Sequence, residues 1–184
     1  MTNKNNFSWL NPSAYPKKTN KYGMGVFVKK IIKKGELVAI IGGHVLTIEN
    51  ENALMNNEDV SDKWVEISES FSIGPVKKSE IPGMPHVYIN HSCNPNCGFK
   101  GQIFIIAMRN IEIEEEITFD YGMIISSNPK STGYFKMKCL CGSKNCRGII
   151  DEEGWKNPIL QKRYKGYFQW YLEEKIKKLN TNKI

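Results

Sequence analysis

The amino-acid sequence predicts a mostly β fold of the α+β class that ends in a helix. Short apolar runs of strand length, separated by turn residues, dominate the chain up to residue 121. Beyond residue 157, apolar residues recur at every fourth position, a spacing typical of an amphipathic helix. With 184 residues, of which 40% are hydrophobic, the chain is long enough for one domain with a real core.

The expected strands follow one another with short turns between them. Their ranges are 25–31 and 36–41 around a Lys-Lys-Gly turn, 63–68 and 71–74 as a hairpin, and 102–108 followed by 115–121. Two segments lack a strand pattern. Residues 1–20, rich in Asn, Lys and Pro, are expected to form an irregular lead-in, and the polar residues 47–62 a surface insert or short helix.

A single amphipathic helix is expected at the C-terminal end. Asn157 is a favourable N-cap, and Pro158 suits the first turn. Gly166 weakens the helix prediction without overturning it. The apolar stripe is expected to pack on the core, and it consists of Leu160, Tyr164, Phe168, Leu172 and Ile176.

Charge changes sign twice along the chain. Residues 1–35 hold eight lysines and no acid, residues 36–120 hold 14 acids against five bases, and residues 121–184 hold 13 bases against five acids. An acidic middle between basic ends argues against a uniformly basic nucleic-acid surface, and leaves nucleic-acid contact through the ends as an alternative. The acidic middle is either a groove that draws a basic peptide or ordinary solvated surface charge.

The composition also bears on the cellular compartment. No apolar run approaches the roughly 18 residues that a membrane span needs, so no membrane partner is expected. Residues 1–11 are polar and lack the apolar stretch of a secretory signal. The sequence therefore predicts an intracellular protein of the cytoplasm or nucleus, where five cysteines favour metal binding or reactivity over disulfides.

Three of the cysteines lie within eight residues, at positions 139, 141 and 146. This spacing allows one tight loop to turn three thiols toward a common centre, and zinc bound by cysteine prefers four ligands in a tetrahedron. A closed site of this kind holds structure and does no chemistry. A zinc-binding interaction module and a loop of reduced, unliganded cysteines are both consistent with these residues. The candidates for a fourth ligand are Cys93, Cys97, His44, His86 and His91.

Three further segments carry polar or glycine-rich patterns that suit a binding site. The stretch YINHSCNPNCG at residues 88–98 crowds amides and an imidazole, which need partners when buried. ITFDYG at residues 117–122 places Phe119 and Tyr121 on one face of a strand and Asp120 on the other. The glycines of the stretch 23–25 allow a ligand to approach the backbone closely.

In this combination and order, the chain resembles the SET-domain family of protein-lysine methyltransferases, in particular its small stand-alone members with a cysteine-rich segment after the catalytic domain. The resemblance covers roughly residues 20–150. NHSC and the Cys-x-Cys-x4-Cys pattern are its most specific parts. The matching pieces are YGMGVFV (22–28), GELV (35–38), YINHSCNPN (88–96), EEITFDYG (115–122) and KCLCGSKNCRG (138–148).

The resemblance implies transfer of methyl groups from S-adenosylmethionine to a lysine amine of a protein, with a histone or another basic protein as substrate. Tyr121 falls on the catalytic position. The residues implied to hold the cofactor are Tyr22, Gly23, Met24, Gly25, Asn90, His91, Tyr121 and Leu140. Those implied to line the lysine channel are Phe119, Tyr88 and Ile41, and Ile41 stands where many members have Tyr. One structural zinc ion is implied on Cys93, Cys139, Cys141 and Cys146.

The resemblance also implies a fold of small curved sheets in which the segment ending at Tyr121 threads beneath the NHSC stretch. The expected division of the chain is a lead-in (1–20), a catalytic domain with a polar insert (21–122), a zinc segment (123–150) and a helical extension (151–184). Ile41 and Val87 depart from the family pattern. A non-catalytic SET-like module that binds basic peptides is therefore the alternative function, and a zinc-stabilised nucleic-acid binder is a third.

Overall fold

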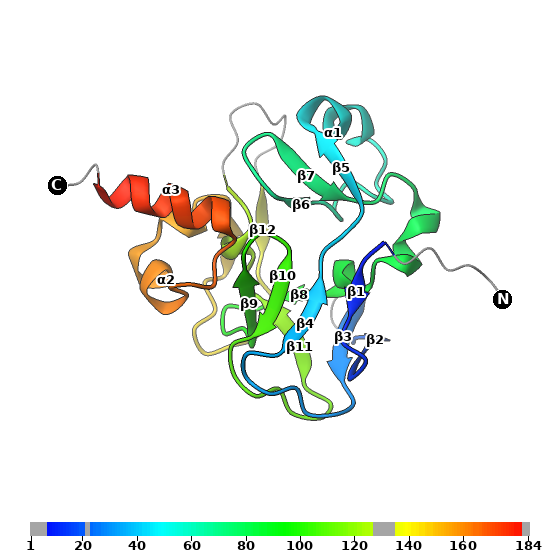
Figure 1. Ribbon diagram of the computed structural model, residues 1–184, viewed down its shortest axis with the longest axis vertical. Coiled ribbons are helices and arrows are strands. Elements are labelled where there is room, and N and C mark those ends of the chain that lie inside the picture. Colours follow the sequence, from blue (N-terminus) through cyan, green and yellow to red (C-terminus); the bar gives the residue numbers. More distant parts are fainter. Residues whose placement is uncertain (1–6, 21–22, 127–134, 182–184) are drawn as a thin grey trace.

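The computed structural model of the protein describes residues 7–20, 23–126 and 135–181, in which the strands form four small sheets (Figure 1). One has the order β1 (Trp9–Leu10), β4 (Leu37–Ile40), β10 (Phe104–Ala107) and β9 (Cys97–Lys100). The second has the order β2 (Ala14–Lys18), β3 (Met24–Val28), β11 (Glu116–Phe119) and β8 (Asn90–His91). The two smaller sheets are β5 (His44–Thr47), β7 (Phe71–Gly74) and β6 (Val65–Glu66), and β12 (Lys136–Lys138) with β13 (Ile149–Asp151).

The described residues form fewer helices than strands. The α-helices are α1 (Ile48–Leu54), α2 (Pro158–Arg163) and α3 (Trp170–Thr181). Short 3₁₀ turns are η1 (Lys78–Gly83), η2 (Pro85–Tyr88), η3 (Tyr121–Met123) and η4 (Gly154–Lys156). The prediction of a mostly β protein with a C-terminal helix is confirmed. None of the helices in the described ranges is long and apolar enough to cross a membrane.

The two four-stranded sheets share one hydrophobic core. In the first sheet, Ile105 of β10 lies between Ala39 and Phe99 of the neighbouring strands, and all three are fully buried. The Phe99 ring meets the ring of Phe119 from the second sheet edge-on at 5.2 Å. Burying a side chain of this size contributes about 1.5–3 kcal/mol, so this packing holds the two sheets together.

The polar insert and the hairpin after it form a separate layer, seen at the top of Figure 1. The predicted hairpin is present as β6 and β7, and β5 adds a third strand that the sequence pattern did not reveal. The short helix α1 has no buried residue, and its N-terminus is capped by Thr47 through a reciprocal arrangement with Asn50. The predicted short helix is therefore present on the surface, whereas Val60, later in the insert, is fully buried.

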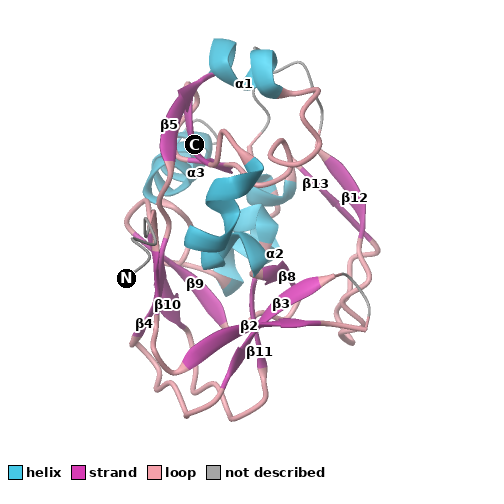
Figure 2. Ribbon diagram, turned by 90° about the vertical axis from the view of Figure 1, so that its right-hand side faces the viewer, coloured by secondary structure: helices cyan, strands magenta, loops and turns pink. Residues whose placement is uncertain are grey.

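The cysteine-rich segment connects the two strands of a hairpin. β12 pairs with β13, and residues 139–148 join them. Figure 2 shows this hairpin set apart from the four-stranded sheets. The hairpin brings the two ends of the cysteine segment together, which the sequence pattern alone did not predict.

The prediction that residues 1–20 form an irregular lead-in is wrong for the described part of that range. β1 and β2 lie there, and each joins a four-stranded sheet. Among the described strands, β2 pairs only with β3 and is therefore an edge strand. Proline such as Pro16 is tolerated in an edge strand, because one side of that strand has no neighbour to share hydrogen bonds with. Only Ala14 of β2 is buried, and this exposure hid the strand in a polar sequence.

The prediction of one continuous C-terminal helix is also wrong. α2 ends at Arg163 and α3 begins at Trp170, and between them Gly166 adopts φ +80°. That left-handed conformation interrupts a right-handed helix and favours glycine. The expected start is correct, since Asn157 accepts a hydrogen bond from the Ile159 N–H and Pro158 opens the first turn. All five residues of the predicted apolar stripe are buried. The prediction was wrong only in treating the two helices as one continuous helix.

Candidate active site

The parallel pairing of β8 with β11 brings the NHSC stretch beside the strand that leads to Tyr121. Asn90 lies opposite Thr118, and His91 opposite Phe119. The Nδ1 atom of His91 accepts a hydrogen bond from the Tyr121 backbone N–H at 3.1 Å, and the two rings lie 5.2 Å apart. Residues 30 positions apart in the sequence are thus in direct contact.

The Asn90 side chain connects this pair to the glycine-rich stretch. Its amide donates to the Met24 carbonyl at 2.9 Å and to Oε1 of Glu116 at 2.7 Å. Gly23 adopts φ +84°, and a Cβ on Gly25 would lie 2.5 Å from Oε1 of Glu116. The conformation of Gly23 therefore favours glycine, and a side chain at Gly25 would displace the Glu116 carboxylate that Asn90 contacts. Tyr22 lies outside the described residues.

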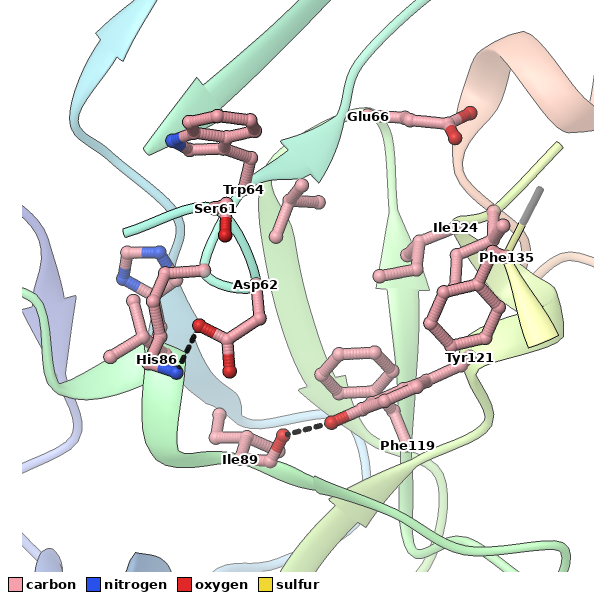
Figure 3. A pocket seen from close by; sticks show the side chains of 14 residues that line it. Ser61, Asp62, Trp64, Glu66, His86, Ile89, Phe119, Tyr121, Ile124 and Phe135 are labelled. Atoms are coloured by element: carbon pink, nitrogen blue, oxygen red, sulfur yellow. Dashed lines mark hydrogen bonds and ion pairs between the residues drawn. The ribbon is translucent and has the colours of Figure 1, made fainter. Parts of the chain in front are cut away.

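Two cavities meet at Tyr121. The larger, called the aromatic cavity, has a volume of about 370 Å³ (Figure 3). It is lined by residues of the insert, η2, β11 and the segment before β12: Ser61, Asp62, Lys63, Trp64, Val65, Glu66, His86, Val87, Ile89, Phe119, Tyr121, Ile124, Ile125 and Phe135. The smaller, called the cysteine-side cavity, has a volume of about 170 Å³ and is lined by Asn90, His91, Tyr121, Met137, Lys138, Cys139, Leu140 and Cys141.

The Tyr121 ring is held by other aromatic groups. It lies 5.3 Å from the ring of Phe119 and 6.3 Å from that of Phe135, and its hydroxyl donates to the Ile89 carbonyl at 3.4 Å. Burial, followed by the nearby carboxylates of Asp62 and Glu116, raises the pKa of Tyr121 to about 12. The hydroxyl therefore keeps its proton at neutral pH and acts as a polar, uncharged group.

The remaining predicted pocket residues divide into two groups. Phe119 lines the aromatic cavity, and Leu140, which is 55% exposed, lines the cysteine-side cavity. Ile41 is buried in the hydrophobic core, and Tyr88 is partly buried against that core. Neither is among the residues that line the aromatic cavity, although both belong to or pack against the same hydrophobic core as Phe119 and Tyr121.

Three of the predicted thiols gather in one place with a histidine. The ligand atoms of His91, Cys93, Cys139 and Cys141 all lie within 4.8 Å of one another, and the sulfurs of Cys93 and Cys139 are 3.8 Å apart. Cys146 is exposed and is not in this group, with its sulfur 3.9 Å from the Cys139 carbonyl oxygen.

This donor set suits a metal ion. Burial acts to raise the pKa of the Cys141 thiol, but hydrogen bonds, first that of the Ser143 hydroxyl, bring it down to about 6. These hydrogen bonds favour the thiolate form of Cys141, whereas burial raises the pKa of Cys139. Thiolates that crowd together without a cation repel one another, and a divalent ion removes this repulsion and the retained proton.

A buried ion pair attaches the cysteine segment to the strand end that carries Tyr121. Asp120 is fully buried and accepts two hydrogen bonds from the Arg147 guanidinium, at 2.5 and 2.7 Å. The Tyr164 hydroxyl, at the end of α2, donates to the same carboxylate at 3.2 Å. The Arg147 backbone N–H also donates to the sulfur of Cys93 at 3.3 Å. Placement of the cysteines and of Tyr121 is thus physically linked.

The comparisons with known proteins agree with this geometry. The sequence profile of the SET domain matches residues 23–122. The chain belongs to the SET domain family. The predicted family is confirmed, and the matched range contains Asn90, His91, Phe119 and Tyr121. The cysteine segment of this SET domain protein lies after the matched range.

Named relatives support the same membership. The variant-silencing SET domain-containing protein of Plasmodium falciparum is 37% identical over 146 residues, which cover 71% of this chain and 5% of that protein. The histone-lysine N-methyltransferase ASHR3 of Arabidopsis thaliana is 31% identical over 144 residues, covering 72% of this chain and 27% of that protein. The chain thus spans a small part of the length of these relatives.

A solved structure shares the fold. The methyltransferase domain of human histone-lysine N-methyltransferase SETMAR superimposes with a TM-score of 0.54 at 21% sequence identity. The match covers 77% of this chain and 58% of that one. The predicted SET fold is confirmed by this likeness.

Several residues of the site were not predicted from the sequence. Glu116 and Arg147 each lie within a recognised motif, and their charge beside buried polar residues was the available signal. Phe135 lies in the predicted zinc segment before its cysteines, and its contact with Tyr121 depends on the β12–β13 hairpin. Glu66 lies within the predicted strand 63–68, which follows the insert.

Proposed function

We propose that the protein transfers methyl groups from S-adenosylmethionine to the side-chain amine of a lysine in a protein substrate. The observation that carries this proposal is that Tyr121 lines both cavities. A reaction between two molecules requires them to meet at one point, and alignment of reactants at such a point contributes roughly 7–11 kcal/mol.

The cofactor is proposed to bind on the side of Asn90 and His91. S-Adenosylmethionine supplies a methyl group on a sulfonium sulfur. Support comes from the Met24 carbonyl, the Asn90 amide and the Glu116 carboxylate, which lie in one hydrogen-bonded row. Leu140 offers an exposed apolar surface in the same cavity for the adenine.

The lysine is proposed to enter through the aromatic cavity. A free lysine has a pKa near 10.4, so fewer than about one in a thousand is neutral at pH 7. Aromatic walls disfavour the ammonium by desolvation and lower that pKa. Tyr121, which keeps its own proton, orients the amine and the methyl group by weak polar contacts and does not act as a base.

The metal is proposed to be zinc, on Cys93, Cys139, Cys141 and Cys146. His91 is the competing ligand, and its tautomer argues against it. Burial lowers the pKa of His91 to about 4, so the ring is neutral. Its Nδ1 accepts from the Tyr121 N–H, which puts the remaining proton on Nε2, 3.3 Å from the sulfur of Cys93. A protonated nitrogen donates to the thiolate and does not ligate a metal.

The substrate is proposed to be a basic protein such as a histone. Residues 36–120 carry 14 acids against five bases, which attracts a positively charged segment toward the aromatic cavity. Histone-lysine methylation is named for the relative in Arabidopsis thaliana. Action in the nucleus or cytoplasm belongs to the same proposal, which does not require contact with nucleic acid.

Transfer of a labelled methyl group to a lysine-rich protein tests the proposal. Tyr121→Phe removes one oxygen from the point where the cavities meet and is expected to lower kcat by roughly 100-fold, a loss that misalignment of the reacting atoms by about 1 Å can cause. Tyr167→Phe is the matched control, because Tyr167 packs against Gly98 and lines neither cavity. Equal activity of wild type and Tyr121→Phe contradicts the catalytic role. Cofactor binding without any transfer by the wild type points to a binding module instead.

A further inference from the structure

The carboxylate of Glu66 is an unexpected buried group at the wall of the aromatic cavity. Strand β6 borders the cavity, but the carboxylate points away from Tyr121 (Figure 3). It accepts from the Ser126 backbone N–H at 3.0 Å and from the Ser126 hydroxyl at 3.2 Å, and it lies 3.0 Å from the Tyr171 hydroxyl oxygen. These groups belong to three segments: β6, the chain just after Tyr121, and α3.

The Tyr171 hydroxyl has a second partner in the segment after Tyr121. It lies 2.5 Å from the carbonyl oxygen of Ile124, which lines the aromatic cavity three residues after Tyr121. Tyr171 is 105 positions from Glu66 and 47 from Ile124. One buried side chain of the C-terminal helix thus contacts both β6 and the segment after Tyr121, two neighbouring parts of the cavity wall.

The number of hydrogens restricts how this connection works. A tyrosine hydroxyl has one hydrogen, and it cannot serve the Ile124 carbonyl and the Glu66 carboxylate together. If Tyr171 donates to Ile124, the 3.0 Å contact is satisfied when Glu66 carries a proton and donates to the tyrosine oxygen. An uncharged Glu66 is also the form that burial favours.

The neighbouring contacts make α3 a rigid support. Leu172 is fully buried, and Tyr171 and Ile176 are buried as well. Just before the helix, the Gln169 backbone N–H donates to the Met123 carbonyl at 3.1 Å, one residue before Ile124. Close packing of this kind transmits small shifts, so the position of α3 is coupled to that of the cavity wall.

We infer that Tyr171 is a positioning residue for methyl transfer: its hydroxyl sets the distance between β6 and the segment after Tyr121, and thereby the width of the lysine-binding cavity. The inference rests on the proposed function, but the contact itself does not. The helical extension lies beyond the range that matches the SET domain, so this support is supplied by a part of the chain outside the family's shared domain.

The kinetic test compares Tyr171→Phe with wild type and with Tyr167→Phe. Tyr171→Phe keeps the ring in the core and removes only the hydroxyl. We expect kcat/KM for a lysine peptide to fall roughly tenfold, as loss of about 1.4 kcal/mol of positioning would give. The dissociation constant of S-adenosylmethionine, measured by calorimetry, is expected to stay unchanged. Glu66→Ala, which removes the carboxyl group beside the Tyr171 hydroxyl, is expected to lower kcat/KM for the peptide as well.

Amide hydrogen exchange gives a readout that does not depend on activity. In Tyr171→Phe, faster exchange is expected at residues 63–68 and 121–126, with no change at residues 24–28 beside Asn90. An inactive wild type with this exchange pattern contradicts the proposed function and keeps the positioning role. Peptide kinetics and exchange rates like those of Tyr167→Phe would overturn the inference, whatever the change in thermal stability.

Discussion

The space around Tyr121 is set by its aromatic neighbours, among them Phe119 on β11. Phe119 is 4% exposed, and its ring lies 5.3 Å from that of Tyr121. A hydroxyl added at this position must occupy part of the aromatic cavity or find a polar partner. We therefore propose that residue size here decides how many methyl groups the substrate lysine nitrogen can carry while it still turns toward the cofactor.

Phe119→Tyr is expected to shift the product toward fewer methyl groups, because the added oxygen reduces the free space beside the lysine nitrogen. Mass spectrometry of the product peptide distinguishes mono-, di- and trimethylated lysine. An unchanged distribution at equal extent of reaction would contradict the assignment of Phe119 to the lysine channel.

The stability of the folded protein is expected to depend on the ion pair between Asp120 and Arg147. Asp120 is fully buried, so removing its cationic partner leaves a charge without compensation. Arg147→Met is expected to lower the free energy of unfolding by about 3–5 kcal/mol. The double variant Asp120→Asn with Arg147→Met is expected to recover part of this loss. Urea denaturation measures both, and a double variant as unstable as the sum of its single changes argues against a coupled pair.

At the scale of elements, the β12–β13 hairpin depends on the proposed metal. Cys146→Ser is expected to lose most of the bound zinc, measured as metal per chain by mass spectrometry, and to weaken cofactor binding. Cys97→Ala is the control, since Cys97 is buried in the core and is not in the group of ligand atoms. Full zinc content in Cys146→Ser would instead favour His91 as the fourth ligand.

The free energy of unfolding is expected to depend on pH through Glu66, which lies where β6 contacts α3. Burial raises the pKa of Glu66 to about 7 from its usual 4.5; hydrogen bonds from Ser126 and Tyr171 act in the opposite direction, and the charge of Glu51 adds to the rise. The folded state therefore binds this proton more tightly than the unfolded state. Stability from this group is complete below pH 4.5 and is lost as the pH rises through about 7.

The expected loss is on the order of 3 kcal/mol across that interval. Urea denaturation of the wild type and of Glu66→Gln at about pH 5 and about pH 8 isolates this contribution, because the variant has no proton to lose at residue 66. Equal pH dependence in the two proteins would mean that Glu66 titrates normally.

At the scale of the whole molecule, the sequence motifs predicted which residues of the candidate site lie close together. Asn90, His91 and Tyr121 were expected together, and β8 and β11 bring them into contact. Cys93 was expected near the cysteine segment, and its sulfur lies 3.8 Å from that of Cys139. The apolar spacing after residue 157 predicted the buried stripe but not the break at Gly166, because burial alone does not report φ.

Long-range contacts outside the motifs were not predictable. The ring of Phe135 lies beside that of Tyr121 because the β12–β13 hairpin places it there. Tyr171 contacts Glu66, which is 105 positions away in the sequence. Neither pairing leaves a periodic or compositional trace in a single sequence. Edge strand β2 was missed for a related reason, since an exposed strand with proline has the composition of a loop.

In the proposed reaction, the two reactants occupy separate cavities that meet at Tyr121. A crystal structure of the protein with S-adenosylhomocysteine and a lysine peptide tests this arrangement directly. We expect the cofactor sulfur on the side of Asn90 and His91, the lysine chain in the aromatic cavity, and the Tyr121 hydroxyl between them. A cofactor bound away from Asn90, or a peptide that leaves the aromatic cavity empty, would contradict it.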